Sequence, residues 1–153
     1  MFGSLGVQRL LCATALRHPP TVLESVTRSL WQRYWGRDED ILSREGQMAA
    51  LTAAGLSASQ AEELLVAASS AEAKQLLTRH TEEALSYGAF GVPAMVLTAP
   101  ANAATCDPSA SSAPAKHLLF GSDRFHVMAA MLKREWHGPK PSSTHRRKLV
   151  SNL

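Results

Sequence analysis

The sequence predicts a mostly helical α+β protein, on three observations. Over roughly the first ninety of the 153 residues, apolar side chains recur at helical spacing between recognisable helix starts and stops. Two short and partly β-branched apolar runs follow at 92–98 and 116–120, and a last amphipathic segment begins after Gly121. Apolar residues make up 45% of the chain, which is enough for a hydrophobic core without support from disulfides or metal.

The first twenty residues allow two interpretations. They contain Arg9, Arg17, a serine and a threonine but no acidic residue, which is the composition of a mitochondrial presequence. The same segment also fits an amphipathic helix of the folded domain, with four leucines mainly on one side: Leu5, Leu10, Leu11 and Leu16. The residues alone leave both interpretations open.

The following helices are predicted from capping and stop signals. Pro19-Pro20 ends the first helix, and Thr21 with Glu24 forms a T-x-x-E capping box for the second. Ser57 with Gln60 predicts another capping box for the fourth helix. The third and fifth helices start or stop at Ser43, Gly55, Ser70 and Gly88. The sequence therefore predicts a helical domain over 1–87.

A β-β-α unit is predicted over 88–138. The two apolar runs read as the strands of a hairpin, joined by a long connection over 99–115 that is rich in Pro, Ala and Ser. A helix begins at Gly121-Ser122-Asp123 and ends at Gly138-Pro139, with an apolar face of Phe125, Met128, Leu132 and Trp136. Residues 139–153 are expected to form a basic flexible tail.

Charge and spacing argue against several functions. The net charge is only +3, and much of the basic excess lies in the tail, so no folded basic face predicts nucleic-acid binding. No apolar run reaches the 18 or so residues of a membrane span. The six histidines lack ligand spacing, which predicts no metal site. Cys12 and Cys106 form no C-x-x-C motif, so neither a disulfide framework nor dithiol chemistry is predicted.

Pro93, at the start of the first predicted strand, is a candidate binding feature. Proline has no N–H for the ladder, so it marks an edge, a bulge or a cis turn. A cis bond after Val92 would expose the backbone N–H and C=O of Val92 to an extended peptide. A trans-proline at a strand start is the commoner alternative.

Ser122, Asp123 and Arg124 form a second candidate feature. The plain interpretation of Ser122 and Asp123 is a helix cap. The same residues could bind a zwitterionic amino-acid end, because Asp123 can accept from an ammonium group while a helix N-terminus and Arg124 favour a carboxylate.

These segments together resemble the kappa-class glutathione transferases, relatives of the DsbA-type and 2-hydroxychromene-2-carboxylate isomerase proteins, from about Gly3 to Pro139. The matching segments are G-S-L at 3–5, the 30–41 stretch with R-D-E-D, S-Y-G-A-F-G-V-P at 86–93 and F-G-S-D-R at 120–124. The resemblance implies a DsbA/kappa-type thioredoxin fold interrupted by a helical domain, with Pro93 cis. It implies that the Val92 main chain binds the cysteinyl part of glutathione, that Ser122 and Asp123 bind its γ-glutamyl end, and that Phe90 and Gly91 shape the turn, with Arg124 in support.

The chain also departs from the family pattern. Family members begin with a strand, a short turn carrying the catalytic serine and a helix, and this sequence shows no counterpart of that unit. We therefore expect an N-terminally truncated glutathione transferase with reduced or no activity and no catalytic residue of its own. The resemblance implies glutathione and an electrophilic small molecule as substrates, no cofactor and a homodimer. It implies a mitochondrial matrix or peroxisomal location, although Ser151-Asn152-Leu153 differs from the S-K-L peroxisomal signal at its middle residue and a cytoplasmic location also fits.

Two other functions stay open. One is a non-catalytic short form that acts through contacts of its helical domain. The other is a DsbA-like oxidoreductase or isomerase, which the missing C-x-x-C disfavours. A glutathione-conjugation assay distinguishes the first alternative from a transferase.

Overall fold

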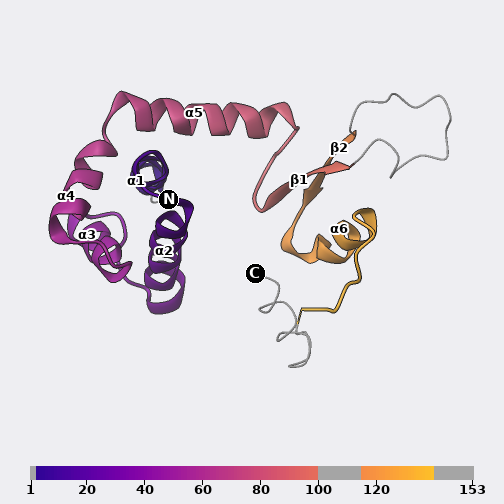
Figure 1. The fold of residues 1–153 in the computed structure, drawn as a ribbon, viewed down its shortest axis with the longest axis horizontal. Helices are drawn as coiled ribbons and strands as arrows, with labels where there is room; N and C mark the ends of the chain where they lie inside the picture. Colours follow the sequence, from indigo (N-terminus) through magenta and orange to yellow (C-terminus); the bar gives the residue numbers. More distant parts are fainter. Residues whose placement is uncertain (1–2, 100–114, 140–153) are drawn as a thin grey trace. The chain divides into compact units, whose positions relative to one another are not determined.

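Helix follows helix over the first part of the chain, as the apolar spacing predicts (Figure 1). The computed structural model describes residues 3–99 and 115–139, and the chain divides into two units, Met1–Glu83 and Ala84–Leu153. The helices are α1 (Leu5–Arg17), α2 (Pro20–Trp31), α3 (Arg44–Ala53), α4 (Ala58–Ala67) and α5 (Ala71–Ser86), and a π-helical turn over Gln32–Gly36 follows α2. The five predicted helices are confirmed.

The helical unit has one core, to which all five helices contribute. Helix α1 packs on α2 and α4, and α3 packs on both α2 and α4. Leu10, Val26, Leu51 and Leu64 are the largest apolar side chains withdrawn completely from solvent, and Ala73 brings α5 to the same cluster. The hydroxyl of Thr14, also fully buried, donates to the Leu10 carbonyl at 2.9 Å, so its burial leaves no unpaired donor.

The buried face of α1 differs from the predicted one. Val7, Leu10 and Thr14 point to the core, whereas Leu5 is 53% exposed and Leu16 is 46% exposed. Each helical residue turns the direction by about 100°, so Leu16 lies on the side opposite Val7. The prediction that the four leucines share one face was therefore wrong, although the helix itself is confirmed.

The capping box predicted at Thr21 and Glu24 was also wrong. Helix α2 begins at Pro20, its N-cap is Pro19, and no side chain caps it. Proline at the first helical position has its φ already set, and its missing N–H would have had no partner there. Glu24 instead accepts from Arg28 at 2.8 Å on the surface. The helix start predicted at Ser43 and the capping box predicted at Ser57 are confirmed.

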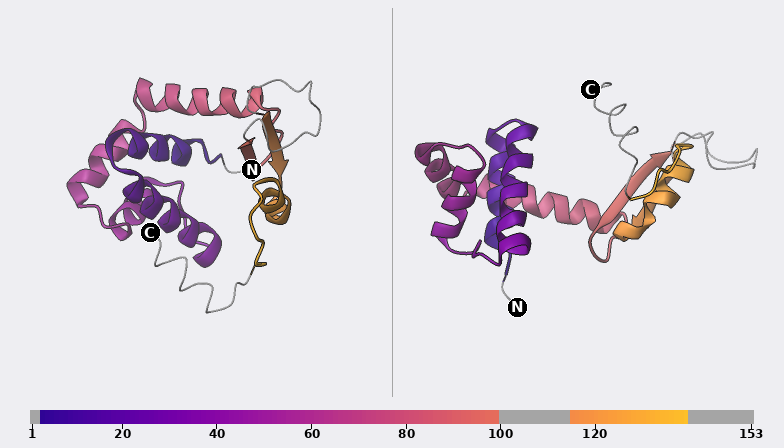
Figure 2. Two further views of the ribbon diagram at one scale, coloured as in Figure 1. Left: turned by 45° about the vertical axis from the view of Figure 1, so that its right-hand side comes forward. Right: turned by 90° about the horizontal axis from the view of Figure 1, so that it is seen from below.

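The second unit contains a β-hairpin followed by a short helix (Figures 1 and 2). Strands β1 (Ala94–Ala99) and β2 (Ala115–Phe120) pair antiparallel, with Ala94 opposite Phe120 and Leu97 opposite His117. Strand β1 starts two residues later than predicted, since Pro93 donates no ladder bond. The predicted hairpin is confirmed, whereas its connection and the tail beyond Pro139 lie outside the described residues.

The last helix is shorter than predicted. A 3₁₀ turn over Ser122–Arg124 leads into α6 (Phe125–Met131). Lys133 has φ +52°, and the N–H groups of Lys133 and Arg134 donate to Ala130 and Ala129, which is a Schellman motif that ends α6. Trp136 therefore lies beyond the helix, where its ring stacks on Phe125 with centroids 6.4 Å apart.

Over 3–99 and 115–139, no helix combines the length and the apolar character that a bilayer span needs.

Candidate functional site

The Val92-Pro93 segment lies in a bend directly before β1. Its peptide bond is cis, as the sequence resemblance implies. Val92 is 89% exposed, and neither its N–H nor its C=O has a hydrogen-bond partner among the described residues. The segment thus presents a donor and an acceptor of the main chain to an incoming peptide.

The Gly121–Arg124 turn lies beside this bend because of the hairpin register. Ala94 is opposite Phe120, and the N–H of Gly121 donates to the Pro93 carbonyl at 3.0 Å. The structure therefore brings together the two segments that the sequence singled out about thirty residues apart. Gly121 has φ +99°, and a Cβ there would lie 2.5 Å from an Asp123 carboxylate oxygen, so the turn requires glycine.

An aromatic pair borders the bend. The rings of Phe90 and Phe120 have centroids 4.5 Å apart, and Phe90 is 76% exposed. A Cβ on Gly91 would lie 2.9 Å from the Phe120 ring, so Gly91 allows the close approach. Phe120 was absent from the predicted site residues; its place before Gly121 in the F-G-S-D-R segment was the available signal.

Ser122, Asp123 and Arg124 are exposed on the turn. They lie within the 3₁₀ turn, whose N-cap is Gly121, and no side chain caps it. The plain interpretation of Ser122 and Asp123 as a helix cap is therefore wrong, and the N-cap residue of α6 is Arg124, whose side chain makes no capping hydrogen bond. The Asp123 carboxylate lies 3.7 Å from the Arg124 guanidinium, an exposed pair that contributes little stability, so both groups stay accessible to a ligand.

The described residues offer neither a metal site nor an activated thiol. No group of three or more His, Cys, Asp or Glu residues is placed to hold a metal ion in the described part of the chain. Cys12 is buried in the helical unit, and burial raises the pKa of its thiol, which makes it less nucleophilic at neutral pH. Cys106 lies outside the described residues.

The chain is similar to known proteins over most of its length. A family model described as a DSBA-like thioredoxin domain matches residues 1–133. The human glutathione S-transferase kappa 1 is 40% identical over 145 residues, which cover 95% of this chain and 58% of the human protein. The rat glutathione S-transferase kappa 1 is 36% identical over the same share of each chain. Glutathione S-transferase kappa 2 of Caenorhabditis elegans is 30% identical over 137 residues, or 90% of this chain and 55% of the worm protein.

The matches confirm the resemblance inferred from the sequence. The chain spans less than two thirds of the length of these curated relatives. The matching family model covers both the helical unit and the hairpin with its following turn. The chain belongs to the DSBA-like thioredoxin domain family and is a relative of the kappa-class glutathione S-transferases.

Proposed function

We propose that the chain binds glutathione at the Val92 bend and the Gly121–Arg124 turn, as a glutathione transferase of the kappa type. The observation that carries the proposal is the hydrogen bond from Gly121 to Pro93, which puts the exposed main chain of Val92 next to the Gly121–Arg124 turn. The names of the relatives support the same ligand. Glutathione is an extended tripeptide whose γ-glutamyl end carries both an ammonium and a carboxylate.

Each part of the proposed site suits one part of the tripeptide. The cysteinyl residue adds to Val92 as a short antiparallel strand, with hydrogen bonds to the Val92 N–H and C=O. Asp123 accepts from the γ-glutamyl ammonium, while Ser122 and the Arg124 guanidinium are available to its carboxylate. Phe90 and Gly91 hold the bend in place through the Phe120 ring.

The transferase reaction requires more than this binding. The glutathione thiolate attacks an electrophilic carbon, a C–S bond forms and the leaving group departs with the electron pair. A free thiol has a pKa near 8.5, so conjugation at neutral pH needs a group that stabilises the thiolate. In the proposed site, the Asp123 carboxylate and the Arg124 guanidinium lie 3.7 Å apart and both are assigned to the γ-glutamyl end, so neither is assigned to the thiol. We therefore propose that these 153 residues hold glutathione without activating it.

The binding proposal is tested with Asp123→Asn. We expect glutathione to bind the variant about three- to tenfold more weakly by calorimetry, because a charge-assisted hydrogen bond to the ammonium is lost from an exposed carboxylate. Cysteinylglycine, which lacks the γ-glutamyl group, should bind the variant and the unchanged chain equally. The control is Glu135→Gln, which removes another exposed carboxylate of the same unit. Equal glutathione affinity in all three proteins would remove Asp123 from the site.

The activity proposal is tested by conjugation of an aryl chloride. We expect the purified chain with glutathione to reach no more than the rate of glutathione in buffer, since no thiolate-stabilising group is assigned to the site. A saturable rate above that background would show that a residue of this chain does activate the thiol.

A DsbA-like redox function is the second candidate, favoured by the matching family model. Against it, Cys12 is buried and the sequence has no C-x-x-C motif. Turnover of a disulfide substrate with a thiol reductant would distinguish this candidate from a transferase.

Location and assembly are carried from the resemblance alone. We propose a homodimer in the mitochondrial matrix or the peroxisome, with no cofactor and with an electrophilic small molecule as second substrate. Sedimentation of the purified chain tests the homodimer, and imaging of a tagged chain in cells tests the location.

A further inference from the structure

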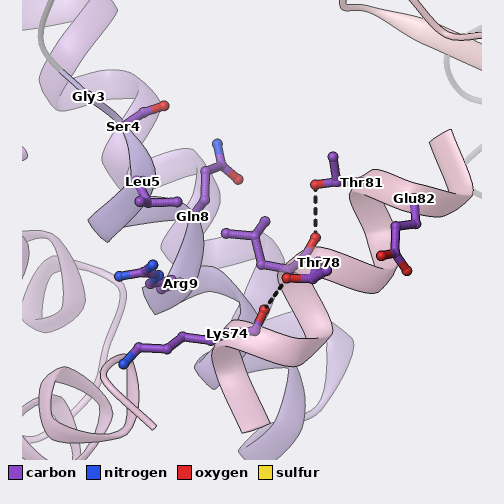
Figure 3. A pocket seen from close by; sticks show the side chains of 10 residues that line it. Gly3, Ser4, Leu5, Gln8, Arg9, Lys74, Thr78, Thr81 and Glu82 are labelled. Atoms are coloured by element: carbon purple, nitrogen blue, oxygen red, sulfur yellow. Dashed lines mark hydrogen bonds between the residues drawn. The ribbon is translucent and has the colours of Figure 1, made fainter. Parts of the chain in front are cut away.

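A groove of about 550 Å³ runs between α1 and α5 of the helical unit (Figure 3). Its walls include Leu5 and Arg9 from α1 and Lys74, Leu77, Thr78 and Thr81 from α5. It shares no residue with the glutathione site proposed above. Its volume lies in the range of small-molecule sites.

The walls are largely apolar. Leu5 and Leu77 are aliphatic, and the two threonines use their hydroxyl hydrogens within α5. Thr78 donates to the Lys74 carbonyl at 3.1 Å and Thr81 donates to the Leu77 carbonyl at 2.9 Å, as the dashed lines in Figure 3 show. The threonines therefore contribute methyl groups to the groove and have no hydrogen left to donate to an anion.

The charges of the groove are unevenly placed. Arg9 and Lys74 form no ion pair with another described residue, and the Nε of Arg9 is shielded from solvent without a hydrogen-bond partner. Glu82 lies eight residues beyond Lys74 on α5, which is about 12 Å along the helix. One end is thus cationic and the other end carries a carboxylate, and the aliphatic side chains between them lie beside the amide of Gln8.

We propose that this groove binds an organic anion with an apolar tail, of the medium-chain alkyl carboxylate class. The carboxylate lies between Arg9 and Lys74, where its oxygens accept hydrogen bonds from the Arg9 guanidinium and from the Lys74 ammonium. The tail follows Leu5, Leu77 and the threonine methyls toward Thr81. Glu82 determines the orientation of the bound anion, because its negative charge repels a carboxylate at that end of the groove.

The proposal is tested by calorimetry on the full chain with sodium octanoate, nonanoate and decanoate, each below its micelle concentration. We expect saturable binding that tightens up to about fourfold per added methylene, the gain from burying one CH₂. Decyltrimethylammonium, with the same tail and the opposite charge, should bind more weakly than decanoate, because the lining residues offer one carboxylate, Glu82, against two cations. Arg9→Gln and Lys74→Gln should each weaken decanoate at least about fivefold by loss of a charge-assisted bond. Thr81→Trp should abolish binding by filling the groove.

The matched control is Arg17→Gln, a charge removed from the last turn of α1 outside the groove. It should leave decanoate binding unchanged, and circular dichroism of every variant shows whether the helices are intact. The proposal is overturned if decanoate does not bind saturably, if the ammonium compound binds as tightly as decanoate, or if both glutamine variants bind like the unchanged chain. It is also overturned if sedimentation shows a dimer that Thr81→Trp dissociates, because a second copy would then occupy the groove.

Discussion

Gly46 shows how one missing side chain fixes a loop against a helix. It lies buried in the first turn of α3, where its N–H donates to the Ser43 hydroxyl at 3.1 Å. A Cβ at this position would overlap the backbone carbonyl of Asp40. The Ser43 side chain and the Leu42 N–H, as hydrogen-bond donors, hold the pKa of the Asp40 carboxyl below its usual range. The R-D-E-D stretch, which helped to identify the family, thus has a structural role in the turn before α3.

We expect two glycine substitutions to change the free energy of unfolding in opposite directions. Gly46→Ala should lower the free energy of unfolding by more than about 1 kcal/mol, because the backbone of Asp40 must move despite the better helix propensity of alanine. Gly6→Ala in α1 should raise it by up to about 0.5 kcal/mol, since the new Cβ would lie 3.9 Å from its nearest neighbour. Urea unfolding measures both. Stabilisation by Gly46→Ala would mean that the backbone at Asp40 can move away from the new Cβ at little cost.

The sequence singled out the residues of the candidate site but not the arrangement that brings them together. The S-Y-G-A-F-G-V-P and F-G-S-D-R segments pointed to Val92 and Asp123, and the resemblance related them to one ligand. Their proximity depends on the register of β1 and β2, which puts Ala94 opposite Phe120. A slip of one residue would turn the strand faces over, and local sequence does not encode that register.

Helix ends were predicted well where the signal is local. Gly55 and Gly88 have φ +95° and +77°, and each closes a Schellman motif in which the N–H of the next residue donates across the helix end. The end of α6 was not predicted, because the residue in the left-handed conformation there is Lys133 and not a glycine. The start of α2 was predicted incorrectly because Pro20 is its first helical residue, one position before the Thr21 that was expected to cap the helix.

The two predicted capping boxes now give opposite expectations. Ser57→Ala should lower the free energy of unfolding of the helical unit by about 1 kcal/mol, because the Ser57 hydroxyl accepts from the Gln60 N–H at 3.2 Å and the cap would be lost. Thr21→Ala should change it by less than about 0.5 kcal/mol, since Thr21 caps nothing and alanine is the better helix former. Thermal unfolding followed by circular dichroism compares them. An equal loss of unfolding free energy in the two variants would mean that Thr21 does cap α2.

Burial is divided unevenly between the two units. Among the described residues, the fully formed apolar cluster belongs to the helical unit, and in the second unit only Ala129 falls in the buried class. The described sheet has two strands, with Val96 39% exposed and Phe120 42% exposed. A two-stranded sheet with little buried apolar surface has little stability of its own.

We therefore expect hydrogen exchange to separate the units. Amides of Leu51 and Leu64 should exchange about two orders of magnitude more slowly than those of Val96 and Leu118, because opening the hairpin exposes far less apolar surface than opening the helical core. Exchange read by NMR on a monodisperse sample measures this ratio. Slow amides throughout β1 would show that the hairpin is stable with the strands described here.

Sequence alone was sufficient for the α+β class, the five leading helices, the hairpin and the family. These depend on periodicity, capping and turn residues, which act within a few positions along the chain. It was not sufficient for the buried face of α1, the short α6 or the groove between α1 and α5. Those features depend on which side chains meet in the folded protein. Arg9 and Lys74, some sixty residues apart in the sequence, line the same groove only because the fold brings α1 and α5 together. Packing is a property of distant pairs, and a local pattern does not contain it.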